Sequence, residues 1–237
     1  MAWEQGTAAD GSDSLAVQIA PESHWPDMHA LICVVSDAKK GTSSTSGMQR
    51  TVETSTLLQH RIKDTVPARM DEITKAIKEH DFDAFARVTM KDSNSFHAVA
   101  LDTEPPIFYL NDVSRSIISL IVEYNRVAVE KTGKVKAAYT YDAGPNAVIY
   151  TEAANVKEII QLIVNYFPQE DFTDPFKLFA SEKLQGAVPE GFNDKVASKW
   201  DVGAVKGLIH TKIGDGPRVL GAEEALLNAD GFPKTLA

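Results

Sequence analysis

Apolar and β-branched residues gather in four short runs that predict strands. Residues 28–36, M-H-A-L-I-C-V-V-S, form a continuous apolar run that is typical of a buried strand. The runs at 134–141 and 147–151 flank the sequence D-A-G-P-N-A, which predicts a β-hairpin closed by a loop of about four to six residues. A last run at 205–213, followed by G-D-G-P, predicts another strand.

Elsewhere the apolar residues recur at every third or fourth position, which predicts amphipathic helices. The face expected for the first of these helices carries Met48, Val52, Leu58 and Ile62. The expected starts of four later helices are marked by Pro67, Asp81, Asn111 or Asp112, and Asn155. Helices therefore come in blocks, an order typical of an α+β fold in which helices cover one face of an antiparallel sheet. Residues 221–237 are expected to form a short helix and a tail.

The hairpin loop is the first candidate for a catalytic or ligand-binding site. It places the carboxylate of Asp142 where a strand ends, Gly144 has no Cβ to hold a ligand away, and Pro145 stiffens the turn. Any tight turn favours Asp, Gly, Pro and Asn, so the loop by itself favours a purely structural hairpin over a functional one.

The loop at residues 37–47 is the second candidate. Lys39 and Lys40 precede the run T-S-S-T-S, which in turn precedes a helix N-terminus. Hydroxyls, unpaired backbone N–H groups and the positive end of a helix together can form an anion site. Taken by itself, the segment fits a well-capped helix after a solvated basic loop somewhat better. The order of residues is not that of a Walker loop.

The third candidate is the segment K-D-S-N-S-F-H at residues 91–97. Asp92, Ser93 and Asn94 are expected to support the hairpin by hydrogen bonds, and His97 is interpreted as a structural histidine rather than as a base. The other histidines show no metal-ligand spacing, and no nucleophile elbow of the form G-x-S-x-G occurs.

Composition and charge narrow the class of partner. The chain of 237 residues is 43% hydrophobic and 24% charged, as in ordinary globular proteins, and no apolar run is long enough to span a membrane. A net charge of −9 without a basic cluster argues against nucleic acid or an anionic membrane as the main partner, but leaves room for a small anion. The single cysteine, Cys33, lies in the first apolar run and is expected to be a buried, inert thiol.

Taken together, several blocks of the sequence resemble the eukaryotic mevalonate diphosphate decarboxylases of the GHMP kinase superfamily. The blocks are V-V-S-D-A-K-K-x-x-S-S-T-x-G-M, V-P-A-R-M, M-K-D-S-N-S-F-H-A, P-P-I-F-Y-L-N-D and A-Y-T-Y-D-A-G-P-N-A-V-I-Y. The head of the chain, A-W-E-Q-G and D-S-L-A-V-Q-I-A, and the sequence G-D-G-P near Gly214 also match. The order and spacing of the blocks over residues 1–167 make the resemblance specific.

The resemblance implies a fold and an activity. The fold is the ferredoxin-like C-terminal domain of GHMP kinases at residues 28–220, with a remnant of the N-terminal domain at 1–27 and a tail at 221–237. The activity is the decarboxylation of mevalonate 5-diphosphate to isopentenyl diphosphate with ATP and Mg²⁺, in the cytoplasm and commonly in a homodimer.

The resemblance also implies roles for particular residues. Asp142 corresponds to the catalytic carboxylate that orients or deprotonates the 3-hydroxyl of the substrate. The substrate-contacting segment corresponds to Ser43, Ser44 and Thr45, with Lys39 and Lys40 as phosphate contacts, and no residue is implied as a metal ligand.

The sequence departs from the family pattern in its length. The family carries, on its N-terminal side, a Tyr-Trp-Gly-Lys substrate segment, a Ser/Gly-rich nucleotide loop and an arginine that binds the substrate carboxylate. The chain is therefore expected to correspond to the C-terminal part of such an enzyme. Phosphoryl transfer depends on positioning and charge stabilisation, so half of the active-site cleft without the ATP-binding part is expected to have little activity alone.

Two other interpretations remain open at this point. One is a non-catalytic α+β module that interacts with a partner or binds diphosphates without turnover. The other is a different small-molecule kinase of the GHMP superfamily. The D-A-G-P-N-A hairpin argues against this interpretation, because it stands in place of a Gly-rich counterpart.

Overall fold

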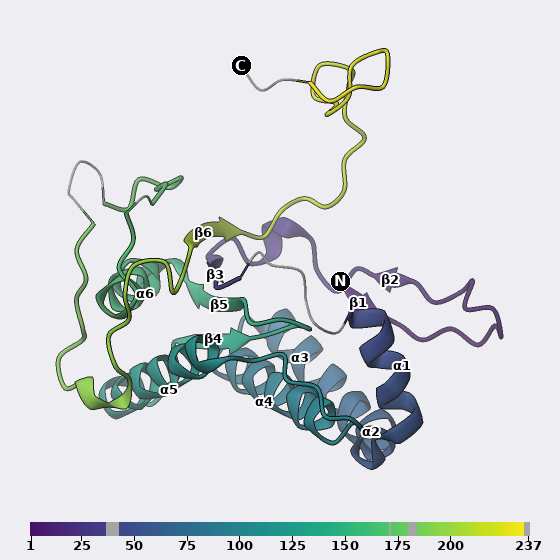
Figure 1. The fold of residues 1–237 in the computed structure, drawn as a ribbon, viewed down its shortest axis with the longest axis horizontal. Coiled ribbons are helices and arrows are strands. Elements are labelled where there is room, and N and C mark those ends of the chain that lie inside the picture. Colours follow the sequence, from purple (N-terminus) through teal and green to yellow (C-terminus); the bar gives the residue numbers. More distant parts are fainter. Residues whose placement is uncertain (37–42, 171, 180–183, 235–237) are drawn as a thin grey trace.

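A four-stranded antiparallel sheet forms the centre of the structure (Figure 1). The computed structural model describes residues 1–36, 43–170, 172–179 and 184–234. The strands of the main sheet, in spatial order, are β4 (Ala137–Thr140), β5 (Ala147–Glu152), β3 (Met28–Val34) and β6 (Gly207–Lys212). A separate small sheet pairs β1 (Ala2–Trp3) with β2 (Ala16–Val17). All pairings are antiparallel, which confirms the expected sheet.

Six α-helices and three short turns of other helical types complete the described part of the chain. The α-helices are α1 (Ser44–Thr54), α2 (Thr56–His60), α3 (Val66–Glu79), α4 (Phe82–Leu101), α5 (Asp112–Thr132) and α6 (Ala153–Tyr166). The turns are the 3₁₀ turns η1 (Glu22–His24) and η3 (Asp194–Val196) and the π-helical turn η2 (Arg61–Thr65). In the described residues, no helix combines the length and the apolar composition needed to cross a bilayer.

The helix caps expected at Asp81 and Asn111 are present, whereas α6 begins at Ala153, before the expected start at Asn155, and has no side-chain cap. The Asp81 side chain accepts a hydrogen bond from the N–H of Ala84 at 3.1 Å and so begins α4. Asn111 and Ser114 form a reciprocal capping box at the start of α5, which ends at Gly133 with a φ of 75°. These polar contacts satisfy N–H groups that the helix itself leaves unpaired.

The first helical segment differs from the prediction in its start, its continuity and its burial. Helix α1 begins at Ser44 rather than Met48, because the Ser43 side chain caps it. Ser55 has an extended backbone and interrupts the helix, and its side chain caps α2. The predicted core face is instead largely exposed, with exposed fractions of 58% for Met48, 63% for Val52 and 52% for Ile62.

The helix expected in residues 221–237 is absent from the described residues up to 234, which form turns and one isolated β-bridge.

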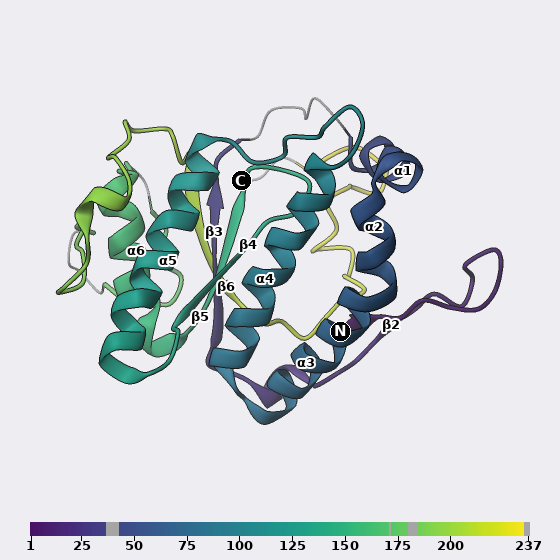
Figure 2. The same cartoon turned by 90° about the horizontal axis from the view of Figure 1, so that it is seen from below.

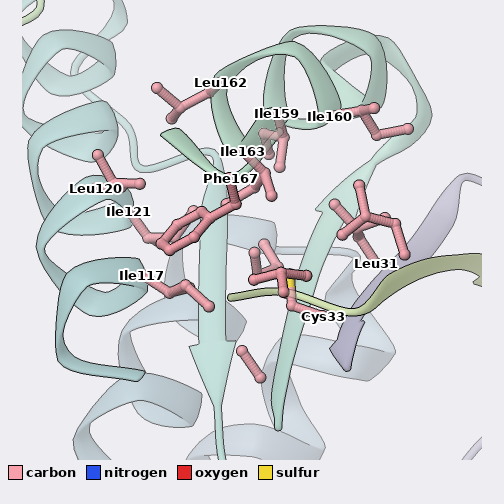
Figure 3. Close-up of a cluster of buried hydrophobic side chains, with 14 of the residues drawn as sticks. Leu31, Cys33, Ile117, Leu120, Ile121, Ile159, Ile160, Leu162, Ile163 and Phe167 are labelled. Carbon is pink, nitrogen blue, oxygen red and sulfur yellow. The ribbon is translucent and has the colours of Figure 1, made fainter. Parts of the chain in front are cut away.

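One face of the main sheet is buried under helices. Figure 2 shows α4 and α5 in front of the strands, and Figure 3 shows side chains of α5 and α6 meeting Leu31 and Cys33 of β3. Ile121 and Ile163 are fully buried in this cluster, together with Ile149 of β5. Burial raises the pKa of the Cys33 thiol to about 12, so the expected inert cysteine is confirmed.

The opposite face carries a row of less buried side chains. The strand register aligns Ile32 with Val148 and Ile209, and Val148 with Thr140, so these four residues cross the sheet side by side. Side chains alternate between the two faces of a strand, and all four point away from the helix-covered core. Ile209 is 52% exposed. A smaller cluster around Trp25, Met28 and α4 covers this face only near the start of β3.

Candidate active site

The hairpin between β4 and β5 has the predicted form, with a loop over residues 141–146. The side-chain oxygen of Asn146 accepts hydrogen bonds from the N–H groups of Val35 at 2.8 Å and Ser36 at 3.0 Å. The carbonyl of Pro145 accepts a hydrogen bond from Ser114 Oγ at 2.8 Å. The loop is therefore fastened both to the end of β3 and to the first turn of α5.

We expect Asn146→Ala to lower the free energy of unfolding by about 1–3 kcal/mol, because two N–H groups at the end of β3 lose their acceptor. Asn146→Asp keeps an acceptor oxygen and is the matched control, with a smaller loss. Urea unfolding followed by circular dichroism measures both variants. Equal losses for Ala and Asp would show that the two hydrogen bonds do not stabilise the hairpin.

Asp142 is exposed at the edge of a hollow on the open face of the sheet. The hollow has a volume of about 350 Å³ and is lined by Ile32, Ser36, Thr140, Tyr141, Asp142, Gly144, Pro145, Asn146 and Val148. Its floor is formed by Ile32, Thr140 and Val148 of the row across the sheet, and its wall is the hairpin loop. An exposed carboxylate in this position can accept a hydrogen bond or a proton from a bound molecule.

The segment at residues 91–97 lies on α4, which packs against strand β4 of the hairpin. Ser93 Oγ accepts a hydrogen bond from the Tyr141 N–H at 3.2 Å, and Asn94 accepts one from the Tyr139 hydroxyl at 3.1 Å. The expected support of the hairpin is confirmed for these two residues. It is wrong for Asp92, whose carboxylate pairs instead with two arginines of the neighbouring helical segments, Arg61 and Arg69.

His97 is buried between aromatic rings beside the hairpin. Its ring lies 6.2 Å from each of the rings of Tyr109 and Tyr141. Burial lowers the pKa of His97, while a hydrogen bond to the Tyr141 backbone and the charge of Asp142 oppose that shift in part. The imidazole is therefore neutral near pH 7, and Asp142 lies within electrostatic reach of it.

The hydroxyl-rich segment forms the N-terminal turn of α1. Ser43 Oγ accepts a hydrogen bond from the Ser46 N–H at 3.1 Å, while Ser43, Ser44 and Thr45 are all exposed. Ser44 and Thr45 thus lie at the positive end of an 11-residue helix, whereas the Ser43 hydroxyl is engaged with Ser46 as the helix cap. Lys39 and Lys40 lie outside the described residues.

Tyr109 lies within electrostatic reach of both α1 and the hairpin loop. Burial raises the pKa of Tyr109, and the charges of both Arg50 and Asp142 act on the same hydroxyl. Arg50 lies six residues along α1 from Ser44, a rise of about 9 Å. Figure 1 shows the hairpin extending toward the side of the molecule where α1 lies. The carboxylate and the hydroxyl-rich helix start thus belong to one side of the structure.

Sequence reasoning did not identify Tyr109 and Arg50 as members of this region. Both are close to blocks that carried the resemblance, Tyr109 within P-P-I-F-Y-L-N-D and Arg50 just after the S-G-M sequence. The electrostatic effect of Arg50 and Asp142 on Tyr109 depends on packing between elements far apart in the chain. Among the described residues, no group of three or more His, Cys, Asp or Glu side chains is arranged to hold a metal ion.

Comparisons with known proteins identify the family of the chain. The family model "Mevalonate 5-diphosphate decarboxylase C-terminal domain" matches residues 30–220. A diphosphomevalonate decarboxylase of Ganoderma lucidum is 73% identical over 235 residues, which are 99% of this chain and 59% of that relative. The chain spans about three fifths of the length of the curated relatives it matches.

Solved structures show the same fold. The X-ray crystal structure of a mevalonate 5-diphosphate decarboxylase is 42% identical, with a TM-score of 0.76, and the match covers 96% of this chain and 57% of that one. A second structure, described as "MDDEF in complex with MVAPP, AMPPCP and Magnesium", is 25% identical with a TM-score of 0.60, and the match covers 70% of this chain and 48% of that one. On sequence and on structure, the chain belongs to the mevalonate 5-diphosphate decarboxylase family.

Proposed function

We propose that this chain forms one side of the active site of an ATP-dependent decarboxylase of isoprenoid and sterol biosynthesis. The reaction converts mevalonate 5-diphosphate into isopentenyl diphosphate. The observation that carries the proposal is the position of Asp142, an exposed carboxylate beside a hollow on the open sheet face, in a chain of this family.

In the proposed reaction Asp142 orients the tertiary 3-hydroxyl of the substrate and accepts its proton as the oxygen attacks the γ-phosphoryl group of ATP. A new oxygen–phosphorus bond forms, and the bond to ADP breaks. The phosphate then leaves C3 with the electrons of the carbon–oxygen bond. The bond between the carboxylate carbon and C2 breaks, its electron pair forms the double bond of the product, and CO₂ is released.

The start of α1 is the proposed anion site. The hydroxyls of Ser43, Ser44 and Thr45 and the first N–H groups of the helix would contact the substrate, and Lys39 and Lys40 would contact phosphate. The exposure of the three hydroxyl residues and the positive helix end support this proposal.

Mg²⁺ would offset the charge of the nucleotide phosphates. The described residues contain no cluster of protein ligands for a metal, and Mg²⁺ is usually held by phosphate oxygens and water with one or two carboxylates. We therefore propose that the nucleotide itself supplies most of the ligands of the ion. The residues of this chain bind and orient the substrate and hold the transferred proton.

The organisation of the protein is also a proposal. Residues 28–220 would form the C-terminal GHMP domain, residues 1–27 a remnant of the N-terminal domain with its own β1–β2 pairing, and residues 221–237 a tail. We propose a cytoplasmic homodimer that uses neither nucleic acid nor a membrane as a partner. The net charge of −9 supports the last point.

A chimaera tests the proposal. In it, this chain is joined to the part of the Ganoderma lucidum relative that lies outside the 235 matched residues. We expect ATP-dependent release of CO₂ from mevalonate 5-diphosphate by the chimaera and little or none by the 237-residue chain alone. A folded chimaera that binds mevalonate 5-diphosphate without turnover would favour the non-catalytic diphosphate-binding module.

A further inference from the structure

One residue of α5, Ser114, is hydrogen-bonded to both ends of the loop that carries Asp142. At the start of the loop, the Tyr141 hydroxyl donates to the Ser114 carbonyl oxygen at 2.9 Å. Near its end, the Pro145 carbonyl oxygen accepts from Ser114 Oγ at 2.8 Å. Ser114 lies in the first turn of α5, and both Ser114 and Tyr141 are buried. The two hydrogen bonds therefore join residues 141 and 145 through a single residue of the core.

The Ser114 hydroxyl is itself oriented by the cap of α5. Its oxygen accepts a hydrogen bond from the Asn111 N–H at 3.3 Å. Its proton can reach two acceptors, the Pro145 carbonyl at 2.8 Å and Asn111 Oδ1 at 3.1 Å. Asn111 Oδ1 already accepts from the Ser114 N–H at 3.0 Å, and the contact with Pro145 is the shorter one. The hydroxyl proton is therefore assigned to the Pro145 carbonyl.

The segment between these two anchors, residues 142–144, includes Asp142. Within the described part of the chain, the Asp142 carboxylate forms no hydrogen bond or ion pair. The direction of this exposed side chain therefore depends on the backbone that carries it. Gly144 in the same segment allows a wide range of backbone conformations, so the anchors on either side determine which one is kept.

Ser114 differs from the other residues that hold the hairpin. Ser93 accepts a hydrogen bond from the Tyr141 N–H at the start of the loop, and Asn146 fastens the end of the loop to β3. Ser114 contacts both ends, so its two hydrogen bonds also fix the separation of residues 141 and 145.

We propose that Ser114 and the Tyr141 hydroxyl form a clamp that positions the Asp142 carboxylate at the hollow, by holding both ends of its loop on α5. This inference rests on the proposed function of Asp142. Ser114 and Tyr141 are positioning residues, and neither hydroxyl needs to touch the substrate. Their effect is on the geometry of the proton-accepting group, and a displacement of about 1 Å can lower the rate of an enzyme about 100-fold.

Removal of either half of the clamp tests the proposal in the chimaera. Tyr141→Phe and Ser114→Ala are each expected to lower kcat about 10–100-fold, with little change in KM for ATP. Tyr141→Phe is the milder change, because the Ser114 carbonyl keeps its partner within α5 when the hydroxyl is removed. Steady-state release of CO₂ and ADP measures both variants.

Tyr166→Phe is the matched control for loss of stability. It removes, from another buried tyrosine, a hydroxyl that donates to a backbone carbonyl, that of Asp194 at 3.2 Å. Tyr166 lies on α6 and has no contact of this kind with the loop. We expect a shift of the urea midpoint similar to that of Tyr141→Phe, but an unchanged kcat. Equal losses of kcat in the two variants would overturn the inference.

Combination with Asp142→Asn tests whether the clamp acts through Asp142. If it does, Tyr141→Phe lowers kcat little further once the proton-accepting carboxylate has been replaced. Effects that multiply in the double variant would mean that the clamp acts on another part of the site, and would overturn the inference. Because Tyr141→Phe carries this experiment, the result does not depend on the folding of Ser114→Ala.

The motion of the loop in the 237-residue chain gives a readout that is independent of activity. Backbone ¹⁵N order parameters of residues 142–144 are expected near about 0.85, the value of rigid backbone, and are expected to fall toward about 0.6 in Tyr141→Phe and Ser114→Ala. Values already below about 0.6 in the unsubstituted chain, or unchanged values in both variants, would overturn the inference.

Failure of this inference can be told from failure of the proposed function. If Asp142→Asn lowers kcat and the variants of Tyr141 and Ser114 do not, Asp142 keeps its role and only the clamp is wrong. If Asp142→Asn keeps the full rate while the order parameters fall in the clamp variants, the clamp holds the loop and the proposed role of Asp142 is wrong.

Discussion

Asp142→Asn in the chimaera is expected to lower kcat about 10²–10⁴-fold, the usual contribution of a positioned general base. Asparagine has nearly the same shape as aspartate and still accepts a hydrogen bond, but it cannot accept a proton near neutral pH. The exposed position of Asp142 in the hairpin loop allows the substitution without loss of a buried contact. The measurement is steady-state release of CO₂ and ADP at saturating ATP.

The control for this experiment is Asp71→Asn, which changes another exposed carboxylate on the surface of α3. We expect its kcat to equal that of the unsubstituted chimaera. If Asp142→Asn keeps the full rate, Asp142 is not the proton acceptor, and the proposed reaction must use another group. Binding of mevalonate 5-diphosphate by calorimetry should change little in either variant if Asp142 acts mainly in the transition state.

Phe167→Ala is expected to destabilise the chain by about 3–5 kcal/mol, the largest effect on stability that we predict. Phe167 follows α6, is fully buried, and its ring stacks on that of Trp200 with centroids 6.3 Å apart. It lies in the cluster where α5 and α6 meet the sheet (Figure 3). Alanine would leave a cavity and remove the aromatic contact.

The matched control is Val122→Ala on the outer side of α5, where the side chain is 54% exposed. Its cost should stay within about 0.5 kcal/mol. Urea unfolding monitored by tryptophan fluorescence and by circular dichroism gives both values. A loss below about 1 kcal/mol for Phe167→Ala would mean that the α6 end of the core can repack around the missing ring.

Local patterns were enough to predict much of the fold. The alternation and turn residues around D-A-G-P-N-A predicted the hairpin, and the caps at Asp81 and Asn111 predicted the starts of α4 and α5. Such features are decided by residues within a few positions of one another, so the sequence contains all the information they need. The position of Asp142 at the end of β4 follows directly from them.

Features that depend on distant residues could not be predicted. Amphipathic spacing indicated an apolar face on α1 but not whether another element covers it, and Met48 and Val52 remain exposed. His97 was expected to be structural, but its aromatic contact with Tyr141, 44 positions later, could not be predicted from the residues near it in the sequence. The pairing of Asp92 with Arg61 and Arg69 likewise required the packing of α4 against the preceding helical segments.

The strict alternation of side chains in β3 and β5 has an evolutionary consequence. Odd-numbered positions such as Leu31, Cys33 and Ile149 build the core, whereas the even-numbered Ile32 and Val148 form the floor of the hollow. Substitutions at Ile32 and Val148 can therefore reshape the hollow while the odd-numbered positions preserve the core. Evolution can change the lining of the hollow at these two positions without compensating changes in the interior, whereas the even-numbered Met28 belongs to a second buried cluster and is constrained by it.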